Sequence, residues 1–295
     1  MAPSSKNSGS LDRAVVVTGA STGIGRAAVA KAVSKGAHVF ASVRKEPDAE
    51  SLRQEFGAAV SPLLFDVADE AAVRAGAAKV AEMLGSQRLF GLVNNAGIAV
   101  PGPLLHLDTE ELRRQFEINL FGVHSVTRAF ADLLGADPQR SGKPGRIVMI
   151  SSVGGQNGSP FVGPYAASKF ALEGYSQSLR RELMLYGIDV IVVGPGAIAT
   201  PIWDKAEQGD LQRFENTPYA PMLKGVADYM VAQGKQGLPA SEVGALIWRC
   251  LTDAKPKTRY SILRRPFMDR TLPSLMNPRT VDRIIAKRLG FPQRS

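Results

Sequence analysis

The feature of this sequence that most restricts its fold is a glycine-rich turn between a short apolar segment and a helical pattern. Residues 14–18, Ala-Val-Val-Val-Thr, are typical of a strand buried within a parallel sheet. Glycines follow at positions 19, 23 and 25, and small apolar residues at helical spacing continue to about Gly36. Such glycines permit a tight turn and a close approach to phosphate, to which the helix N-terminus offers its N–H groups. The segment therefore predicts a strand–turn–helix unit that binds a dinucleotide.

Apolar segments and helical patterns alternate along most of the chain. Further strands are expected at residues 38–43, 60–65, 89–93, 146–150, 188–193 and 258–263. Helices are expected near residues 49–56, 69–84, 109–134, 165–186 and 239–251. Because this alternation is typical of βαβ units, the sequence predicts an α/β fold. The expected architecture is a doubly wound, Rossmann-like parallel sheet of about seven strands with helices on both faces.

The predicted domain organisation has one main unit. Residues 1–12 are expected to form a disordered tail, and residues 13–265 a single Rossmann-like domain. Within it, residues 201–237 lack a strand signal but contain aromatic and methionine side chains. They suit a mobile lid over an apolar substrate, with ordinary core helices as the alternative. Residues 266–295 form a basic extension with apolar residues at helical spacing, expected to pack on the domain or on a partner subunit.

Composition restricts the compartment and the partners. The 295 residues carry a net charge of +9, and much of the excess lies after residue 255. Such a patch suits a phosphorylated cofactor, an acidic membrane surface or nucleic acid, but a solvated basic tail is the preferred explanation. Cys250 is the only cysteine, so neither a disulfide framework nor a Cys/His metal site is expected. Without an apolar run of about 18 residues or a signal-peptide pattern, a cytoplasmic protein is expected.

Tyr165 and Lys169 are candidate catalytic residues because they lie four apart, on one face of a predicted helix. A neighbouring ammonium group lowers the pKa of a phenol, so Tyr165 is expected to give or take a proton at ordinary pH. Ser152 follows the predicted strand 146–150, and its hydroxyl should point into the crevice where open α/β sheets bind ligands. Taken alone, a tyrosine and a lysine at this spacing would indicate only a helix face exposed to solvent.

Polar residues also follow other predicted strands. Arg44 ends the second strand, where no carboxylate occurs and a guanidinium suits a ribose 2′-phosphate. NADP(H) is therefore favoured, with NAD(H) as the alternative. Asp66 ends the third strand near the expected adenine position, and residues 94–97, Asn-Asn-Ala-Gly, follow the fourth. Asn119 lies inside a predicted helix, where a buried asparagine needs a polar partner.

These motifs occur in an order that identifies a family. The chain resembles the short-chain dehydrogenases/reductases (SDR), in their single-domain branch. The resemblance covers residue 14 to about residue 200. It is carried by the glycine turn at 18–25, Asp66-Val67, the motif at 94–97, Asn119, Ser152, Tyr165-x-x-x-Lys169 and Pro195-Gly196-x-Ile198-x-Thr200. A sugar epimerase or dehydratase of the extended branch fits less well, because that branch typically has a Thr-Gly-x-x-Gly-x-x-Gly turn and a larger C-terminal domain.

The resemblance implies a metal-free hydride transfer between a nicotinamide and a carbonyl carbon. Tyr165 would be the general acid of reduction and the base of oxidation. Lys169 would lower the pKa of Tyr165 and hold the nicotinamide ribose, and Ser152 would hydrogen-bond the substrate oxygen. Asn119 would anchor a water that links Lys169 to a proton relay. The implied catalytic residues are Asn119, Ser152, Tyr165 and Lys169.

The resemblance also implies a set of cofactor-binding positions and an oligomer. Asp66 would bind the adenine amine, and Ile198 with Thr200 would meet the carboxamide. The complete set is Gly19, Ser21, Thr22, Gly23, Ile24, Gly25, Arg44, Asp66, Val67, Asn94, Ala96, Gly97, Tyr165, Lys169, Pro195, Gly196, Ile198 and Thr200. Family members are commonly dimers or tetramers packed through the helices of Asn119 and Tyr165. A homodimer or homotetramer is therefore expected, with a small-molecule substrate and no nucleic-acid partner.

Two departures from the family pattern concern the substrate. Gly194 stands where a bulkier or polar residue is more common, which is expected to widen the pocket beside the nicotinamide. The long C-terminal extension resembles that of members acting on steroids, retinoids and other lipophilic alcohols, which suggests a bulky lipophilic ketone or alcohol. One alternative is a non-catalytic nicotinamide-cofactor-binding sensor or scaffold. Another is a protein that binds a membrane surface or nucleic acid through its basic extension.

Overall fold

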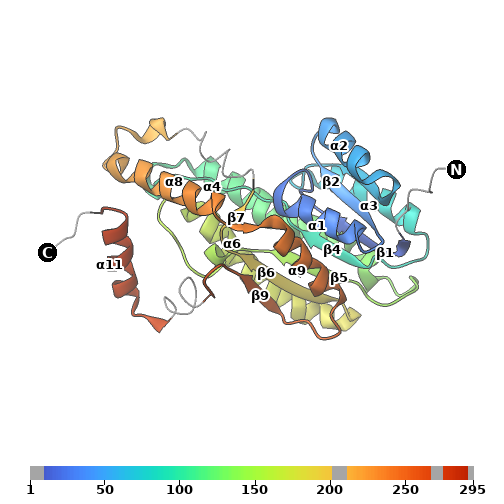
Figure 1. Ribbon diagram of the computed structural model, residues 1–295. Helices are drawn as coiled ribbons and strands as arrows, with labels where there is room; N and C mark the ends of the chain where they lie inside the picture. Colours follow the sequence, from blue (N-terminus) through green and yellow to red (C-terminus); the bar gives the residue numbers. More distant parts are fainter. Residues whose placement is uncertain (1–9, 201–210, 267–274, 292–295) are drawn as a thin grey trace.

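The protein is built around one parallel sheet with helices on both faces (Figure 1). The computed structural model describes residues 10–200, 211–266 and 275–291. The sheet has seven strands in the order β3-β2-β1-β4-β5-β6-β9, and every pair is parallel. The strands are β1 (Ser10–Val17), β2 (Ala37–Val43), β3 (Val60–Leu64), β4 (Gly91–Asn94), β5 (Arg146–Ile150), β6 (Asp189–Pro195) and β9 (Arg259–Ile262).

The helices form a layer on each face of this sheet. One layer comprises α1 (Gly23–Val33), α2 (Glu46–Phe56) and α9 (Ala240–Thr252). The other comprises α3 (Glu70–Leu84), α5 (Gly122–Ala131) and α6 (Gly163–Glu182). Helix α4 (Thr109–Phe116) leads into α5. The predicted doubly wound, Rossmann-like fold is confirmed.

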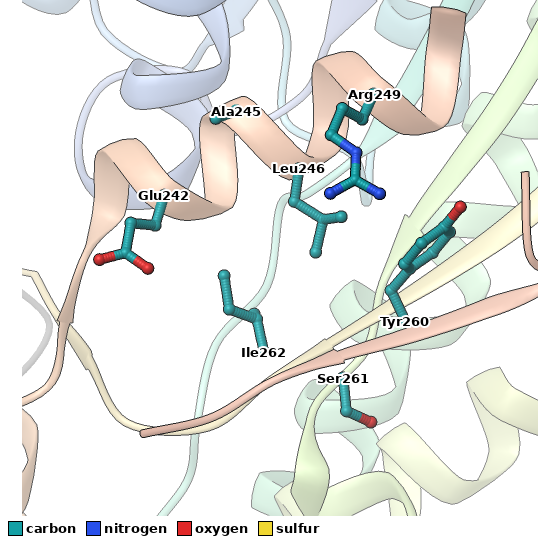
Figure 2. A pocket seen from close by; sticks show the side chains of 7 residues that line it. All are labelled: Glu242, Ala245, Leu246, Arg249, Tyr260, Ser261 and Ile262. Atoms are coloured by element: carbon teal, nitrogen blue, oxygen red, sulfur yellow. The ribbon is translucent and has the colours of Figure 1, made fainter. Parts of the chain in front are cut away.

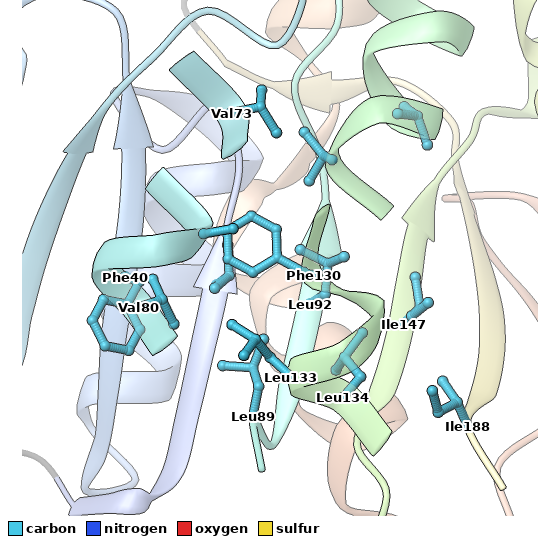
Figure 3. Packing of buried hydrophobic residues seen from close by; sticks show 14 of the residues in the cluster. Phe40, Val73, Val80, Leu89, Leu92, Phe130, Leu133, Leu134, Ile147 and Ile188 are labelled. Carbon is cyan, nitrogen blue, oxygen red and sulfur yellow. The ribbon is translucent and has the colours of Figure 1, made fainter. Parts of the chain in front are cut away.

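Each face of the sheet has its own apolar core, because strands covered on both faces bury nearly every side chain. In one core, Phe130 of α5 and Val80 of α3 pack with Leu92 and Ile147 from the strands (Figure 3). In the other, Ile247 of α9 and its neighbours pack on the opposite sides of the same strands. Burying one such large apolar side chain stabilises the fold by about 1.5–3 kcal/mol.

The strand order reverses beside β1, which has β2 on one side and β4 on the other. The connection that leaves β1 leads to β2 on one side, and the connection that leaves β4 leads to β5 on the other side. The carboxyl ends of β1 and β4 therefore border a crevice. The glycine turn after β1 and the motif at residues 94–97 after β4 lie at this reversal. The fold therefore brings the motifs of separate strands to one edge of the sheet.

Two element boundaries differ from the sequence predictions. Strand β1 begins at Ser10, which pairs with Ala37 ahead of an irregularity in the register, so the domain starts before residue 13. The rest of the expected tail, residues 1–9, lies outside the described residues. The helix predicted over 109–134 is interrupted by a π-helical segment at Glu117–Phe121, and another follows at Asp132–Ala136. Wide π turns of this kind re-aim side chains and are frequent at functional sites.

The last third of the chain is more helical than its pattern suggested. Of the expected lid, residues 201–210 lie outside the described residues. The remainder forms a short turn at Gln212–Phe214 and the helix α8 (Ala220–Lys235). A small second sheet pairs β7 (Ile198–Ala199) with β8 (Leu238–Pro239).

The basic extension contains the helix α11 (Pro278–Arg288), which lies beside α8 in Figure 1. The guanidinium of Arg288 stands 4.5 Å from the ring centroid of Tyr229 on α8, and Leu289 and Phe291 pack on a small apolar cluster there. The extension thus contacts its own chain. Among the described helices, none is both long and apolar enough to cross a membrane.

Candidate active site

The glycine turn joins β1 to α1 in a conformation that suits glycine. Gly19 and Gly23 have φ angles of +63° and +59°, in the left-handed region that side chains disfavour. A Cβ on Gly25 would lie 2.2 Å from the carbonyl oxygen of Gly19. Thr22, the N-cap of α1, makes no side-chain capping hydrogen bond, and the first turn contains no acidic residue. The N–H groups at this helix end can therefore receive an anion, which fits the pyrophosphate of a dinucleotide.

Thr18 and Asn95 join the ends of β1 and β4 beside this turn. The Oγ1 atom of Thr18 accepts hydrogen bonds of 3.0 Å from the N–H groups of Asn95 and Ala96. The Nδ2 atom of Asn95 donates to the carbonyl oxygens of Thr18, at 2.8 Å, and Gly19, at 3.0 Å. Asn95 is not among the site residues predicted from the sequence. The two successive asparagines after the strand were the pattern that indicated it. Asn95 holds the turn in shape.

Asn94 lies differently from the expectation that it borders the cofactor. Its side chain is 2% exposed and donates hydrogen bonds to Oγ1 of Thr127, at 2.9 Å, and to Sδ of Met149, at 3.4 Å. Successive strand residues point to opposite faces, so Asn94 points toward α5 and Asn95 toward the turn. The Asn94 side chain therefore fastens α5 to the sheet.

Arg44 and Asp66 follow the neighbouring strands β2 and β3 and form an ion pair. Nη1 of Arg44 lies 3.7 Å from Oδ2 of Asp66, and the two side chains are 61% and 40% exposed. Oδ1 of Asp66 accepts a 3.1 Å hydrogen bond from the N–H group of Ala68. Val67 is buried, and a Cβ on Gly122 of α5 would lie 2.8 Å from it. This edge therefore presents one cation and one anion to the same region of the crevice.

Ser152 and Tyr165 meet beyond the end of β5. Ser152 caps the short helical turn Val153–Gly155, and its Oγ accepts a 3.0 Å hydrogen bond from the N–H group of Gly154. Tyr165 lies in the first turn of α6. Burial raises the pKa of the Tyr165 phenol, and a hydrogen bond with the Ser152 side chain acts in the opposite direction. The structure thus pairs the two hydroxyl groups that the sequence singled out.

Lys169 lies one turn after Tyr165 and is 5% exposed. Its Nζ atom is 5.8 Å from the Tyr165 ring centroid and donates a 2.8 Å hydrogen bond to the carbonyl oxygen of Ile150. Burial lowers the pKa of Lys169 to about 8, and the charge of Glu173 opposes that change. The pKa of Tyr165 is raised here, whereas the sequence predicted that Lys169 lowers it. Burial of the phenol is the largest influence on its pKa and outweighs the hydrogen bond with Ser152.

Asn119 lies in the π-helical segment and is fully buried. Its Oδ1 accepts a 2.9 Å hydrogen bond from the N–H group of Ile98, and its Nδ2 donates to Ile98 O and to Ser168 Oγ at 3.0 and 3.1 Å. The predicted buried partner therefore exists. A Cβ on Gly97 would lie 3.2 Å from Oδ1 of Asn119 and 3.7 Å from Nζ of Lys169. Asn119 and Lys169 thus converge on the same side of Gly97.

The segment after β6 faces the glycine turn. The N–H group of Gly196 donates a 2.9 Å hydrogen bond to Ile262 O, and Ile198 is buried in β7. A Cβ on Gly23 would lie 3.2 Å from Cγ2 of Thr200. The segment therefore reaches across the crevice to the start of α1.

Gly194 does not widen a pocket, and that expectation is wrong. The guanidinium of Arg259, from β9, occupies the space, and a Cβ on Gly194 would lie 2.5 Å from its Nη2 atom. The missing side chain at position 194 is replaced by a charged one from the neighbouring strand. The sequence gives no sign of this, because the two residues meet only when β6 and β9 pair.

An aromatic cluster borders the loop that leads into α6. Phe161, four residues before Tyr165, is the only non-glycine residue in the described part of the chain with a positive φ, +63°. Its ring lies edge-on to Tyr219 and stacks on Phe291 of the extension, with both centroids 5.8 Å away. The N–H group of Gly102 donates a 2.8 Å hydrogen bond to Phe161 O. The C-terminal extension thereby contacts the loop that leads into the helix of Tyr165.

A hollow of about 400 Å³ lies elsewhere, between α9 and β9 (Figure 2). It is lined by Glu242, Ala245, Leu246, Arg249, Tyr260, Ser261 and Ile262. None of the candidate catalytic residues lines it. The strand ends and the glycine turn, rather than this hollow, define the candidate active site.

Comparison with known proteins gives concordant matches over most of the chain. The family model for short chain dehydrogenases matches residues 13–211. The NADPH-dependent 3-dehydrocapnine reductase of Ornithobacterium rhinotracheale is 37% identical over 94% of this chain and 97% of that protein. Human retinol dehydrogenase 16 is 31% identical over 85% of this chain and 80% of that protein. A short-chain dehydrogenase structure from Streptomyces avermitilis has a TM-score of 0.75 and 28% identity, covering 94% of this chain and 97% of the other.

Proposed function

The chain belongs to the short-chain dehydrogenase family, and from this we propose that it is an NADP(H)-dependent oxidoreductase acting on a carbonyl group. It interconverts a ketone or aldehyde and the corresponding alcohol. The observation that carries the proposal is the pairing of Ser152 with Tyr165, next to the buried Lys169, at the edge of the sheet that bears the glycine turn. A protein that only binds a dinucleotide has no need of these three side chains in one place.

The reaction divides between the cofactor and the side chains. NADPH supplies a hydride to the carbonyl carbon when it is bound. The Ser152 hydroxyl donates a hydrogen bond to the carbonyl oxygen and orients it. Tyr165 gives its phenolic proton to that oxygen as negative charge develops there. The Lys169 ammonium stabilises the resulting phenolate, and Asn119 anchors a water through which the proton is replaced.

The same residues explain why the site needs an intact scaffold. Lys169 is held by Ile150 O, and Asn119 by the peptide of Ile98, so neither side chain can turn freely. Preorganised groups of this kind stabilise charge in the transition state without rearranging at the moment of reaction. When the reaction runs toward alcohol oxidation, the deprotonated Tyr165 acts as the base.

Arg44 supports NADP(H) as the preferred cofactor. It is a cation at the end of β2, where a dinucleotide fold meets the adenosine ribose, and its partner Asp66 is 3.7 Å away. At that distance and exposure the ion pair is weak, so the guanidinium can turn to a 2′-phosphate. Asp66 would then bind the adenine amine. The relative from Ornithobacterium is named as NADPH-dependent, in agreement with this preference.

A bulky lipophilic substrate is the class that the surroundings favour. Phe161, Tyr219 and Phe291 gather apolar surface beside the loop that leads to Tyr165. Leu104 and Leu105 are 63% and 83% exposed, and Leu104 lies against Gly163 at the start of α6. Apolar walls with few polar groups select by size and hydrophobicity. One relative is named after retinol, which is a lipophilic alcohol.

We also propose a homo-oligomer, in a cytoplasmic setting, packed through the helices that bear Asn119 and Tyr165. Leu112, Phe121 and Phe170 are 38%, 54% and 47% exposed on those helices. Exposed large apolar side chains on adjacent helices are typical of subunit contacts. Light scattering on the purified protein, with Phe121→Ser as a comparison, measures the subunit number directly. A monomer in both samples would remove this part of the proposal.

The function is tested by initial rates of NADPH and NADH oxidation, side by side, with small and bulky ketones. We expect NADPH with bulky ketones to give the highest kcat/KM. Faster turnover with NADH would remove the cofactor preference but leave the chemistry of Tyr165 intact. Binding of both cofactors without turnover of any ketone would instead favour a cofactor-binding sensor or scaffold.

A further inference from the structure

Glu173 of α6 and Arg259 of β9 form an ion pair directly behind the candidate active site. Nε of Arg259 donates to both carboxylate oxygens of Glu173, at 3.2 and 3.0 Å, and Nη2 donates to Oε1 at 3.0 Å. The side chains of Arg259 and Glu173 are 17% and 11% exposed. Planar pairing through several hydrogen bonds at this depth fixes both groups far better than a surface ion pair does.

Both partners contact the segment that carries Ser152. Nη2 of Arg259 lies 3.5 Å from the carbonyl oxygen of Ser152. A Cβ on Gly155, in the turn after Ser152, would lie 3.1 Å from Cγ of Glu173 and 3.0 Å from Lys169 O. The ion pair is thus wedged between helix α6, strand β9 and the turn that presents the substrate-binding hydroxyl.

We propose that Glu173 and Arg259 are positioning residues, which hold the turn of Ser152 in place and balance the charge around Lys169. This inference rests on the proposed function, since it assigns a role in the same reaction. Glu173 lies four residues after Lys169 on the same helix face, so its carboxylate favours the ammonium form. Arg259 is bound to that carboxylate through three hydrogen bonds, so its positive charge offsets the negative charge of Glu173.

The charged surroundings of Lys169 allow the two effects to be separated. On its own helix the titratable neighbours are Tyr165 and Glu173, and Arg259 of β9 pairs with Glu173. The π-helical segment presents the neutral Asn119, and β5 presents the carbonyl of Ile150 with Ser152 beyond it. Losing Glu173 removes the carboxylate that favours the ammonium form, whereas losing Arg259 leaves that carboxylate unpaired. The two losses should therefore shift the titration of Lys169 in opposite directions.

The absence of a side chain at position 194 belongs to the same arrangement. A Cβ there would meet Nη2 of Arg259 at 2.5 Å and Ser152 O at 3.3 Å. Gly194→Ala should therefore displace the guanidinium from its partners. In a chain that already lacks Arg259, the same alanine meets no guanidinium and should do little further harm.

The experiment measures the pH dependence of kcat/KM for ketone reduction by wild type, Glu173→Gln and Arg259→Met, with Glu70→Gln as the matched control. Glu70 pairs with Arg74 on the exposed face of α3, far from the site. We expect the alkaline fall in activity to begin about one pH unit lower in Glu173→Gln and about one unit higher in Arg259→Met. Glu70→Gln should follow the wild type. Shifts in the same direction, or none, overturn the charge-balancing role.

Thermal unfolding of Gly194→Ala, Arg259→Met and the double variant provides a readout that is independent of turnover. We expect each single variant to melt at a lower temperature and the double variant to melt no lower than Arg259→Met alone. Fully additive losses overturn the positioning role. If Arg259→Met fails to fold, Arg259→Lys replaces it. Its kcat should fall, while the alkaline fall of its pH profile should begin at the same pH as in the wild type. A shift of that alkaline fall contradicts the proposal. A wild type that reduces no ketone refutes the proposed function instead, and the unfolding cycle then still decides the positioning role.

Discussion

Lys169 and Ile150 tie helix α6 to the end of strand β5 through a single 2.8 Å hydrogen bond, from the ammonium to the last carbonyl of the strand. Ser152 lies two residues beyond Ile150, and Tyr165 one helical turn before Lys169. The bond therefore fixes the serine hydroxyl and the phenol relative to each other. Because Lys169 is only 5% exposed, keeping its ammonium group charged costs folding free energy.

We expect the stability of the protein without cofactor to rise with pH between about 8 and 10.5, because the pKa of Lys169 is about 8 when folded, against an ordinary 10.5. Within that window the unfolded chain still binds the proton that the folded chain has released, so rising pH favours folding. The full effect corresponds to about 3 kcal/mol. Below the folded pKa the cost of the buried charge is present in full.

Urea unfolding of wild type and Lys169→Met across this pH range measures the effect. Tyr165 and the other groups that titrate are common to both proteins, so the difference between the two free energies of unfolding isolates Lys169. The free energy of unfolding of the wild type should increase relative to that of the variant as pH rises. Two curves that stay parallel would show that Lys169 titrates near its ordinary pKa.

Gly25→Ala should abolish tight cofactor binding and destabilise the fold. The added Cβ would stand 2.2 Å from Gly19 O and 2.6 Å from Nδ2 of Asn95, so the turn must open. Forced overpacking of this kind typically costs about 1–3 kcal/mol. Gly174→Ala is the control, because a Cβ there meets nothing within 4 Å on the exposed side of α6. It should stabilise the helix by about 0.5–1 kcal/mol. NADPH fluorescence and melting temperature report both effects, and equal behaviour of the two variants would contradict the account.

Arg44→Ala should lower kcat/KM for NADPH by about tenfold to a hundredfold, the worth of a hydrogen bond to a charged group. Activity with NADH should change little, because the guanidinium addresses the 2′-phosphate. Lys45→Ala, one residue on, is the matched loss of a basic side chain. If NADPH and NADH suffer alike, or if Lys45→Ala has the larger effect, Arg44 does not read the phosphate.

Phe291→Ala should raise KM for bulky ketones while leaving small ketones unaffected. Its ring stacks on Phe161 with an interplanar angle of 14°. Aromatic pairs contribute about 0.5–1.5 kcal/mol beyond the area that they bury, which corresponds to a change of about twofold to tenfold. Leu185→Ala, at a 79% exposed residue in the short helical turn that follows α6, is the control. An equal rise in KM for small and bulky ketones would place the cluster outside the substrate pocket.

The local parts of the structure could be predicted from the sequence. Strand β5 and helix α6 have their own periodicity, and the motifs at their ends fall where strand ends must meet. The fold follows, since alternating strands and helices have few ways to bury both faces of a parallel sheet. The same logic placed Tyr165, Lys169 and Ser152 together without any knowledge of their distances.

Contacts between distant residues could not be predicted in the same way. Arg259 reaches Glu173 across 86 residues, and neither position has a local pattern that announces the other. Asn95 reaches Thr18 across 77 residues, and alternation along β4 decides that Asn95, not Asn94, faces the turn. The direction of the pKa change at Tyr165 depends on how deeply its phenol is buried, which spacing does not reveal.

The most direct test of the account replaces Tyr165 by Phe, which removes one oxygen atom and keeps the ring. NADPH oxidation with a bulky ketone and the NADPH dissociation constant are measured on the same preparation. We expect kcat to fall by at least about a hundredfold, the usual contribution of a positioned general acid, while NADPH affinity changes by less than about threefold. Turnover at the wild-type rate would show that Tyr165 is not the proton donor and would contradict the central claim.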